Sequence, residues 1–289
     1  MKKQYTIAHL SDLHLTSNSE GRRKEDKKRN MNANLMRILN HSSVQVADLV
    51  IVTGDITDRG ELAAWNHFWS AVKSASLNRK KMLVIHGNHD VACLDFSRRK
   101  PKEEYLAIVK AGLRSGGQKY KFPYVRTFCD GEIGVFCVDS VNAGNFNIFT
   151  NAVGTLGFEQ LYKLGRLIRD YDDIRCKLIV LHHSPNIPKR ATSKKRRERP
   201  TKFWHRLAMQ LERDDRIRLR LLARTFGVKA ILHGHTHDNL DRPVNSVRII
   251  GTCDSTVTKK SGQLNYKRYS YYPDSKILKR QPICELKGE

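Results

Sequence analysis

The stretch Met82-Leu83-Val84-Ile85-His86-Gly87-Asn88-His89-Asp90 runs from four apolar residues directly into a cluster of histidine, asparagine and aspartate. A short apolar run without polar alternation is typical of a strand that is buried on both faces. The same transition occurs five times in the chain. The other four clusters are Asp12-Leu13-His14, Gly54-Asp55-Ile56-Thr57-Asp58-Arg59-Gly60, His182-His183 and His233-Gly234-His235-Thr236-His237. We expect the rest of the chain to be the scaffold that brings these clusters together.

Strands and helices are predicted to alternate through the first 90 residues. We expect strands at 4–10, 48–53 and 81–85, with helices at 31–42 and 61–74 between them. Alternation of this kind builds a parallel sheet in an α/β fold. The carboxyl ends of parallel strands meet at one edge, where open α/β folds place their sites, so the polar clusters should converge there.

The later part of the chain continues with mixed elements. Pro101 is well placed to open a helix through Val109, and 124–129 and 133–138 could form a hairpin around Gly131. The remaining expected elements are helices at 155–170 and 202–225 and strands at 176–181, 228–232, 247–250, 263–272 and 277–285. No internal repeat or linker is visible. We therefore predict one domain over residues 1–289, with a basic loop inserted at about 186–202.

The charge balance is strongly basic, with 53 lysines and arginines against 29 acids and a net charge of +24. This excess favours a polyanionic partner such as nucleic acid or nucleotide over a merely well-hydrated surface. Two loops concentrate the charge, at 22–29 and 189–199. Each is either a solvated loop or an arm that contacts phosphate. The apolar fraction of 39% excludes a disordered composition.

The six cysteines include no Cys-x-x-Cys pair, and several lie in apolar runs. We expect them to be reduced and buried, in a cytoplasmic protein. No secretory signal is visible at the start of the chain, and no apolar run reaches 18 residues, so no membrane span is expected.

The polar clusters contain the side chains that bind borderline cations such as Mn, Fe, Zn, Co or Ni. The carboxylate of Asp55 can bridge two ions, and Asn88 offers a neutral oxygen. The pairs Asp12 with His14 and His235 with His237 each lie two residues apart, so both members can turn into one cleft. A single histidine at a strand end is more often a hydrogen-bonded core residue, but five coincidences favour a metal site.

These five motifs, in this order, resemble those of the calcineurin-like metallophosphoesterase superfamily, over about residues 5–240. Within it, the His182-His183-Ser184-Pro185 motif is most similar to that of the small bacterial phosphodiesterases. The resemblance implies two mixed β-sheets packed as a sandwich flanked by helices, which modifies the plain parallel sheet. It also places the C-terminal strands, about 244–286, in the second sheet.

The resemblance further implies two metal ions. One would be held by Asp12, His14, Asp55 and His237, and the other by Asp55, Asn88, His182 and His235. His183 remains the alternative to its neighbour His182. The ions would clamp the phosphoryl oxygens and lower the pKa of a bridging water, so that a bridging hydroxide attacks phosphorus.

The same resemblance suggests roles for residues beside the metals. His89 would bind the phosphate or protonate the leaving group, next to Asn88 at the substrate, and Asp58 would orient His89. Arg59 would either contact phosphate or pair with a local carboxylate. His233 is interpreted as a structural histidine.

The predicted function is a metal-dependent phosphoric ester hydrolase, and above all a phosphodiesterase acting on nucleotides or nucleic acid. One alternative is a phosphomonoesterase or cyclic-nucleotide phosphodiesterase. Another is a nucleic-acid-binding component of an assembly in which hydrolysis is secondary. The native metals, the substrate and the oligomeric state stay open at this point.

Overall fold

The computed structural model describes residues 3–18, 30–93, 99–142, 152–186, 211–237, 239–258 and 263–287. The predicted basic loops at 22–29 and 189–199 lie outside these ranges, as does the predicted insertion beyond residue 186.

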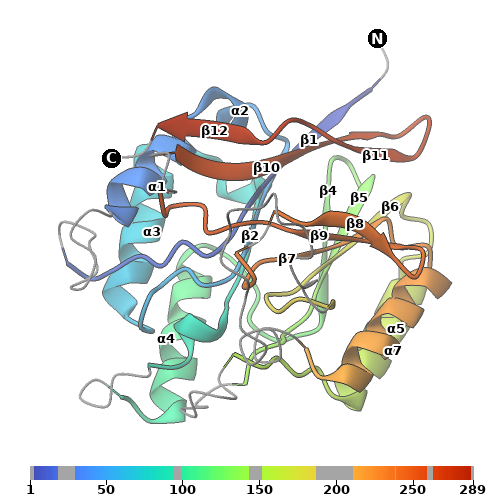
Figure 1. Ribbon diagram of the computed structural model, residues 1–289, viewed down its shortest axis with the longest axis horizontal. Helices are drawn as coiled ribbons and strands as arrows, with labels where there is room; N and C mark the ends of the chain where they lie inside the picture. Colours follow the sequence, from blue (N-terminus) through green and yellow to red (C-terminus); the bar gives the residue numbers. More distant parts are fainter. Residues whose placement is uncertain are drawn as a thin grey trace, which may run out of the picture.

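The first of two six-stranded sheets has the order β11-β10-β1-β2-β3, and β12 also pairs with β10 (Figure 1). Its strands are β1 (Tyr5–Leu10), β2 (Leu49–Thr53), β3 (Met82–Ile85), β10 (Gln263–Tyr272), β11 (Ile277–Arg280) and β12 (Cys284–Lys287). The three N-terminal strands are parallel, as predicted, whereas β10 runs antiparallel to β1.

The second sheet has the order β4-β5-β6-β7-β9-β8. Its strands are β4 (Tyr124–Phe128), β5 (Ile133–Cys137), β6 (Cys176–Val180), β7 (Ala230–His233), β8 (Asp241–Val244) and β9 (Val247–Gly251). The predicted hairpin of β4 and β5 is confirmed. Strand β8 was not predicted, because its sequence Asp-Arg-Pro-Val is polar and contains a proline, which is tolerated at a sheet edge.

The prediction for the C-terminal strands is wrong in part. Strand β9 does lie in the second sheet, but β10, β11 and β12 join the first sheet. The reason is the pairing of β10 with β1, for example Ile7 with Tyr269. The side chains of both residues are buried in the layer between the sheets. No local pattern in the sequence specifies this pairing over more than 250 residues.

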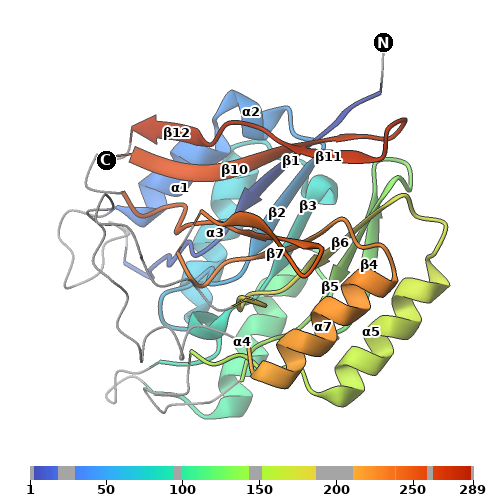
Figure 2. The same ribbon diagram turned by 45° about the vertical axis from the view of Figure 1, so that its right-hand side comes forward.

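Helices cover the outer faces of both sheets, so the predicted two-sheet α/β fold is confirmed (Figures 1 and 2). Helices α1 (Met31–Leu39), α2 (Ser42–Gln45), α3 (Leu62–Ser74) and α4 (Lys102–Ser115) belong to the first sheet, and α5 (Phe158–Asp170) and α7 (Arg213–Thr225) to the second. Short 3₁₀ turns lie at Arg79–Lys81 and Asn88–Asp90. Among the described residues, no helix is both long and apolar enough to span a membrane.

Two predicted helices start differently in the structure. Of the predicted helix 202–225, residues 202–210 lie outside the described ranges, and α7 begins at Arg213, because Leu211 forms a bridge with Gly154. Helix α5 begins at Phe158 instead of 155, because Gly157 has a φ of +72° that a helix cannot contain.

Successive residues of β2 face opposite apolar layers. Leu49 and Ile51 lie between the two sheets, whereas Val50 and Val52 lie in the layer that contains α1 and α3. Burial of such a side chain is worth about 1.5–3 kcal/mol. This explains the absence of polar alternation and makes the strand a rigid support for the loop that follows it.

Candidate metal centre

The loops after β1, β2, β6 and β7 bring the candidate ligands together in two groups. In each group, one ligand atom from every residue lies within 4.8 Å of the others. The groups are Asp12 with His14 and His237, and Asp55 with His182 and His235. A further group of this kind joins His14 to Asp58 and His89.

Asp55 lies between the two main groups. Its Oδ2 is 3.3 Å from His182 Nε2 in one group and 4.0 Å from His14 Nε2 in the other. Its Oδ1 accepts a hydrogen bond of 2.8 Å from the backbone N–H of His89. The carboxylate is therefore held in place, with one oxygen directed at histidines of both groups.

The ring nitrogens of two histidines are assigned by their hydrogen bonds. His182 Nδ1 donates to the Thr53 carbonyl at 2.8 Å, which leaves Nε2, 3.0 Å from Asn88 Oδ1, as a possible metal ligand. His235 Nε2 donates to the Ala152 carbonyl at 2.9 Å, which leaves Nδ1. Such hydrogen bonds to the second nitrogen are typical of metal-binding histidines.

His183 lies beside the centre but outside both groups. Its Nδ1 is 3.0 Å from Ser140 Oγ, and its ring centroid is 4.4 Å from that of His235. Gly154 packs against the ring so closely that an added Cβ would lie 2.4 Å from it. The two adjacent histidines therefore point to different neighbours.

The backbone is strained at the candidate ligands. Asp12, His14, Asp55, His235 and His237 all have φ values between +48° and +65°, in the left-handed region. For residues other than glycine this conformation costs of the order of 1–3 kcal/mol and gathers at functional sites. Most of the other described non-glycine residues with positive φ lie in turns between strands.

Two glycines allow the loops to approach one another. A Cβ on Gly87 would lie 2.2 Å from Asp55 Oδ1, and a Cβ on Gly234 would lie 1.8 Å from Ser11 Oγ. Only glycine fits at either position without movement of its neighbours.

Carboxylates and imidazoles in the centre strongly perturb one another. Burial disfavours the charge on Asp55, but the nearby imidazoles, led by His182, hold the pKa of its carboxyl well below the usual value. Burial also lowers the pKa of His182, but Asp55 outweighs it and raises the value to about 9. His237 reaches about 9 in the same way beside Asp12. A cation that binds here would displace these protons.

His89 and Asp58 make contact through the main chain. His89 Nδ1 donates to the Asp58 carbonyl oxygen at 2.9 Å. The Asp58 carboxylate is 4.0 Å from His89 Nδ1 but 3.6 Å from His14 Nδ1. Arg59 Nε lies 3.5 Å from Asp58 Oδ2, so the structure contains the local pairing that was the alternative to a phosphate contact.

Asp90 joins two of the loops. Its Oδ2 accepts hydrogen bonds from the backbone N–H groups of Gly87 and Ile56, at 2.8 and 3.2 Å, and its Oδ1 accepts one from Thr57 at 2.8 Å. Burial, reinforced by Asp55, raises its pKa to about 6. Sequence reasoning assigned no such role to this residue.

Sequence reasoning also did not identify Asp254 as a residue of the centre. Its Oδ2 lies 3.8 Å from Nδ1 of His237, whose Nε2 is 3.3 Å from Asp12 Oδ1. The signal was present, because Asp254 closely follows the apolar run of β9, just as the other clusters follow their strands. His233 is buried, and its Nδ1 lies 2.8 Å from the Gly234 carbonyl.

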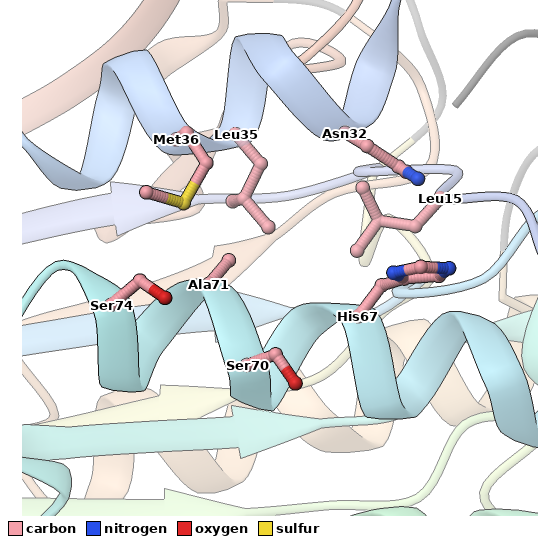
Figure 3. A pocket seen from close by; sticks show the side chains of 8 residues that line it. All are labelled: Leu15, Asn32, Leu35, Met36, His67, Ser70, Ala71 and Ser74. Atoms are coloured by element: carbon pink, nitrogen blue, oxygen red, sulfur yellow. The ribbon is translucent and has the colours of Figure 1, made fainter. Parts of the chain in front are cut away.

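A separate pocket of about 190 Å³ lies between α1 and α3 (Figure 3). Leu35 and Met36 of α1 face Ala71 and Ser74 of α3 across it, and Leu15 lines one end. None of the candidate ligands lines this pocket.

Comparison with solved structures supports the fold. The chain superposes on a dimetal phosphatase from Danio rerio with a TM-score of 0.62, 12% identity and 99% of each chain covered. A purple acid phosphatase from yellow lupin gives a TM-score of 0.60 at 11% identity, with 94% of this chain and 50% of that chain covered.

Curated relatives are more similar in sequence. A probable cyclic nucleotide phosphodiesterase from Vesicomyosocius okutanii is 23% identical over 94% of this chain and 96% of its own length. The 3',5'-cyclic adenosine monophosphate phosphodiesterase CpdA of Escherichia coli K12 is 26% identical over 80% of this chain and 69% of its own. The calcineurin-like phosphoesterase family profile matches residues 5–239. The chain therefore belongs to the calcineurin-like phosphoesterases, which are metal-dependent phosphoester hydrolases.

Proposed function

We propose that the chain is a phosphodiesterase for nucleotide or nucleic-acid diesters and that two metal ions bind at the centre. The observation that carries the proposal is the position of Asp55 between two groups of ligand side chains. One ion would be held by Asp12, His14, Asp55 and His237, and the other by Asp55, Asn88, His182 and His235.

The donor set fits such ions. Imidazole, carboxylate and amide oxygen, without a thiolate, suit Mn, Fe, Zn, Co or Ni. We assign His182 in preference to His183, because His182 Nε2 lies near both Asp55 and Asn88 while His183 contacts Ser140. The five strained ligand positions are explained if the strain places ligand atoms toward a cation.

When bound, the ions would polarise the phosphoryl oxygens and supply a water nucleophile at neutral pH. His89 is 39% exposed, and its Nδ1–H is held by the Asp58 carbonyl. This leaves Nε2 to bind the phosphate or to give a proton to the leaving oxygen. Asp58 would act as a positioning residue, and Arg59 would reach phosphate only by leaving Asp58.

Two observations bear on the substrate. The curated relatives are named as cyclic-nucleotide phosphodiesterases, which favours cyclic nucleotides as the second candidate. The net charge of +24 favours a larger polyanion, because a small substrate with one phosphate needs no such excess. Nucleic-acid binding with only secondary hydrolysis is the remaining alternative.

The test is hydrolysis by the Mn-loaded protein of bis-p-nitrophenyl phosphate, p-nitrophenyl phosphate, cyclic AMP and single- and double-stranded DNA and RNA. We expect diester and polymer cleavage that is lost in Asp55→Asn and kept in the control Asp274→Asn, which lies exposed in the turn between β10 and β11. Cleavage of the monoester alone, or no loss in Asp55→Asn, would contradict the proposal.

A further inference from the structure

Large apolar side chains are exposed on both α5 and α7, the two helices that cover the second sheet. The exposed fractions are 69% for Phe158, 58% for Tyr162, 47% for Ile217 and 53% for Leu221. The two helices lie side by side (Figure 2), and Gly165 of α5 allows close contact with Leu222 of α7. We call Phe158, Tyr162, Ile217, Arg218 and Leu221 the α5–α7 face.

The aromatic rings of this face are arranged in parallel. Phe158 and Tyr162 are one helical turn apart, with ring centroids 6.2 Å apart and ring planes inclined by 21°. The guanidinium of Arg218 lies over the Phe158 ring, 5.9 Å from its centroid. Exposed parallel rings with an arginine over one of them match the surfaces on which single-stranded nucleic acids stack their bases.

The charge around the rings is mainly positive. Helix α7 has five arginines in its 13 residues, of which Arg213, Arg218 and Arg224 are exposed. Of the acids nearby, Glu159 pairs with Lys163 at 2.6 Å, and Asp215 is buried and accepts the backbone N–H of Leu156. Glu212 and Asp214 are exposed at the start of α7, next to Arg213, and are outnumbered by the three exposed arginines of that helix. This charge complements a phosphate backbone, whereas a symmetric contact with a second copy would bring two basic helices together.

The face is connected to the metal centre by a short segment. Gly154 packs against the ring of His183, and only three residues lie between Gly154 and Phe158. The four steps from the Cα atom of Gly154 to that of Phe158 span at most about 14 Å. A strand with a phosphate at the centre would therefore reach the rings with a base further along the strand.

We propose that the α5–α7 face binds the bases of a single-stranded nucleic acid, so that the substrate is a polymer. This inference rests on the proposed function for its link to catalysis, but the binding itself does not. The aromatic pair would stack bases, and Arg218 would contact the phosphate between them.

The test separates ring stacking from general apolar contact. We would measure the anisotropy of fluorescein-labelled dT and U oligonucleotides with the full chain in EDTA, which prevents cleavage. Phe158→Leu/Tyr162→Leu keeps apolar side chains but removes the rings. We expect its Kd to rise at least ~5-fold, since one stacked base is worth about 5- to 150-fold in affinity. The control Tyr171→Ala removes an exposed aromatic side chain just after the other end of α5 and should bind like the parent.

Other occupants give different results. Absence of oligonucleotide binding by the parent, or equal binding by the leucine variant, overturns the proposal. It is equally overturned if Phe158→Ala/Tyr162→Ala loses only vesicle binding, measured with phosphatidylserine vesicles, or only self-association, measured by sedimentation. Hydrolysis of bis-p-nitrophenyl phosphate is measured in parallel. If oligonucleotide binding depends on the rings but no hydrolysis occurs, the proposed binding role of the α5–α7 face is supported and the proposed function is refuted. If hydrolysis occurs without oligonucleotide binding, the proposed function is supported and the binding role of the face is refuted.

Discussion

Removal of the Asp90 carboxylate is expected to damage the metal centre without touching a candidate ligand. In Asp90→Ala, the buried N–H groups of Gly87, Ile56 and Thr57 all lose the acceptor that the carboxylate provides. Each buried unsatisfied donor costs roughly 1–3 kcal/mol. Because the loops can relax, we expect the three donors together to lower the free energy of unfolding by an amount near the low end of their sum, about 3–5 kcal/mol. Asp90→Asn keeps one acceptor oxygen and should lose less.

The effect on metal binding follows from the same contacts. Asp90 ties the loop that contains Asp55 to the loop that contains Asn88, and residues in such supporting positions typically change metal affinity by about 10- to 100-fold. We expect weaker Mn binding in the order parent, Asp90→Asn, Asp90→Ala.

Two measurements check this reasoning. Urea unfolding in EDTA gives the free energy of unfolding without the stabilisation that bound metal adds. Isothermal titration with Mn, below the unfolding transition, gives the affinity of the folded protein. The control is the exposed Asp274→Ala. If Asp90→Ala unfolds like the control and binds Mn like the parent, the carboxylate does not hold the loops and the argument fails.

Four further outcomes are expected. His89→Ala should bind both metals yet lose about 10²- to 10⁴-fold in turnover, and loss of metal from a folded variant would refute the assigned role. Gly234→Ala should displace Ser11 and cost about 1–3 kcal/mol in thermal unfolding, so an unchanged Tm would contradict the close approach. Burial lowers the pKa of Lys267 from 10.5 to about 8, so between these values the unfolded chain holds a proton that the folded chain has released. Stability due to this group therefore rises with pH there, by up to about 1.4 kcal/mol per unit. Lys267→Met lacks this titration, so its free energy of unfolding relative to the parent should fall from pH 8 to 10 in urea unfolding. Chelation should abolish hydrolysis of bis-p-nitrophenyl phosphate, and Mn should restore it; activity that survives exhaustive chelation would exclude the metal proposal.

Residue type and local spacing were enough to predict most strands and to propose candidate ligands, which the structure brings close together. Runs such as Leu49–Thr53 are apolar throughout because both faces of the strand are buried, and the helices were found by their apolar periodicity. The polar clusters could be interpreted as metal ligands because ligand chemistry depends on side-chain identity. Their convergence could be predicted because the residues that follow a strand lie at the edge of the sheet.

The choices between equivalent residues depended on the tertiary structure. His182 and His183 are neighbours with the same side chain, and only contacts with Thr53, Asn88 and Ser140 distinguish them. These partners lie between 43 and 129 residues away in the chain, and no local pattern encodes which of them a side chain will meet.

The sequence by itself thus determined which kinds of ligand side chain follow the strands, since ligand types and strand ends are local properties, and the five motifs together indicated the family. The three-dimensional structure decided which sheet β10 joins, that Asp58 holds His89 by its carbonyl, and that Asp90 joins two loops. It also exposed the rings of the α5–α7 face, which periodicity alone does not separate from core positions. All of these depend on contacts between distant segments, which form only when the sheets pack.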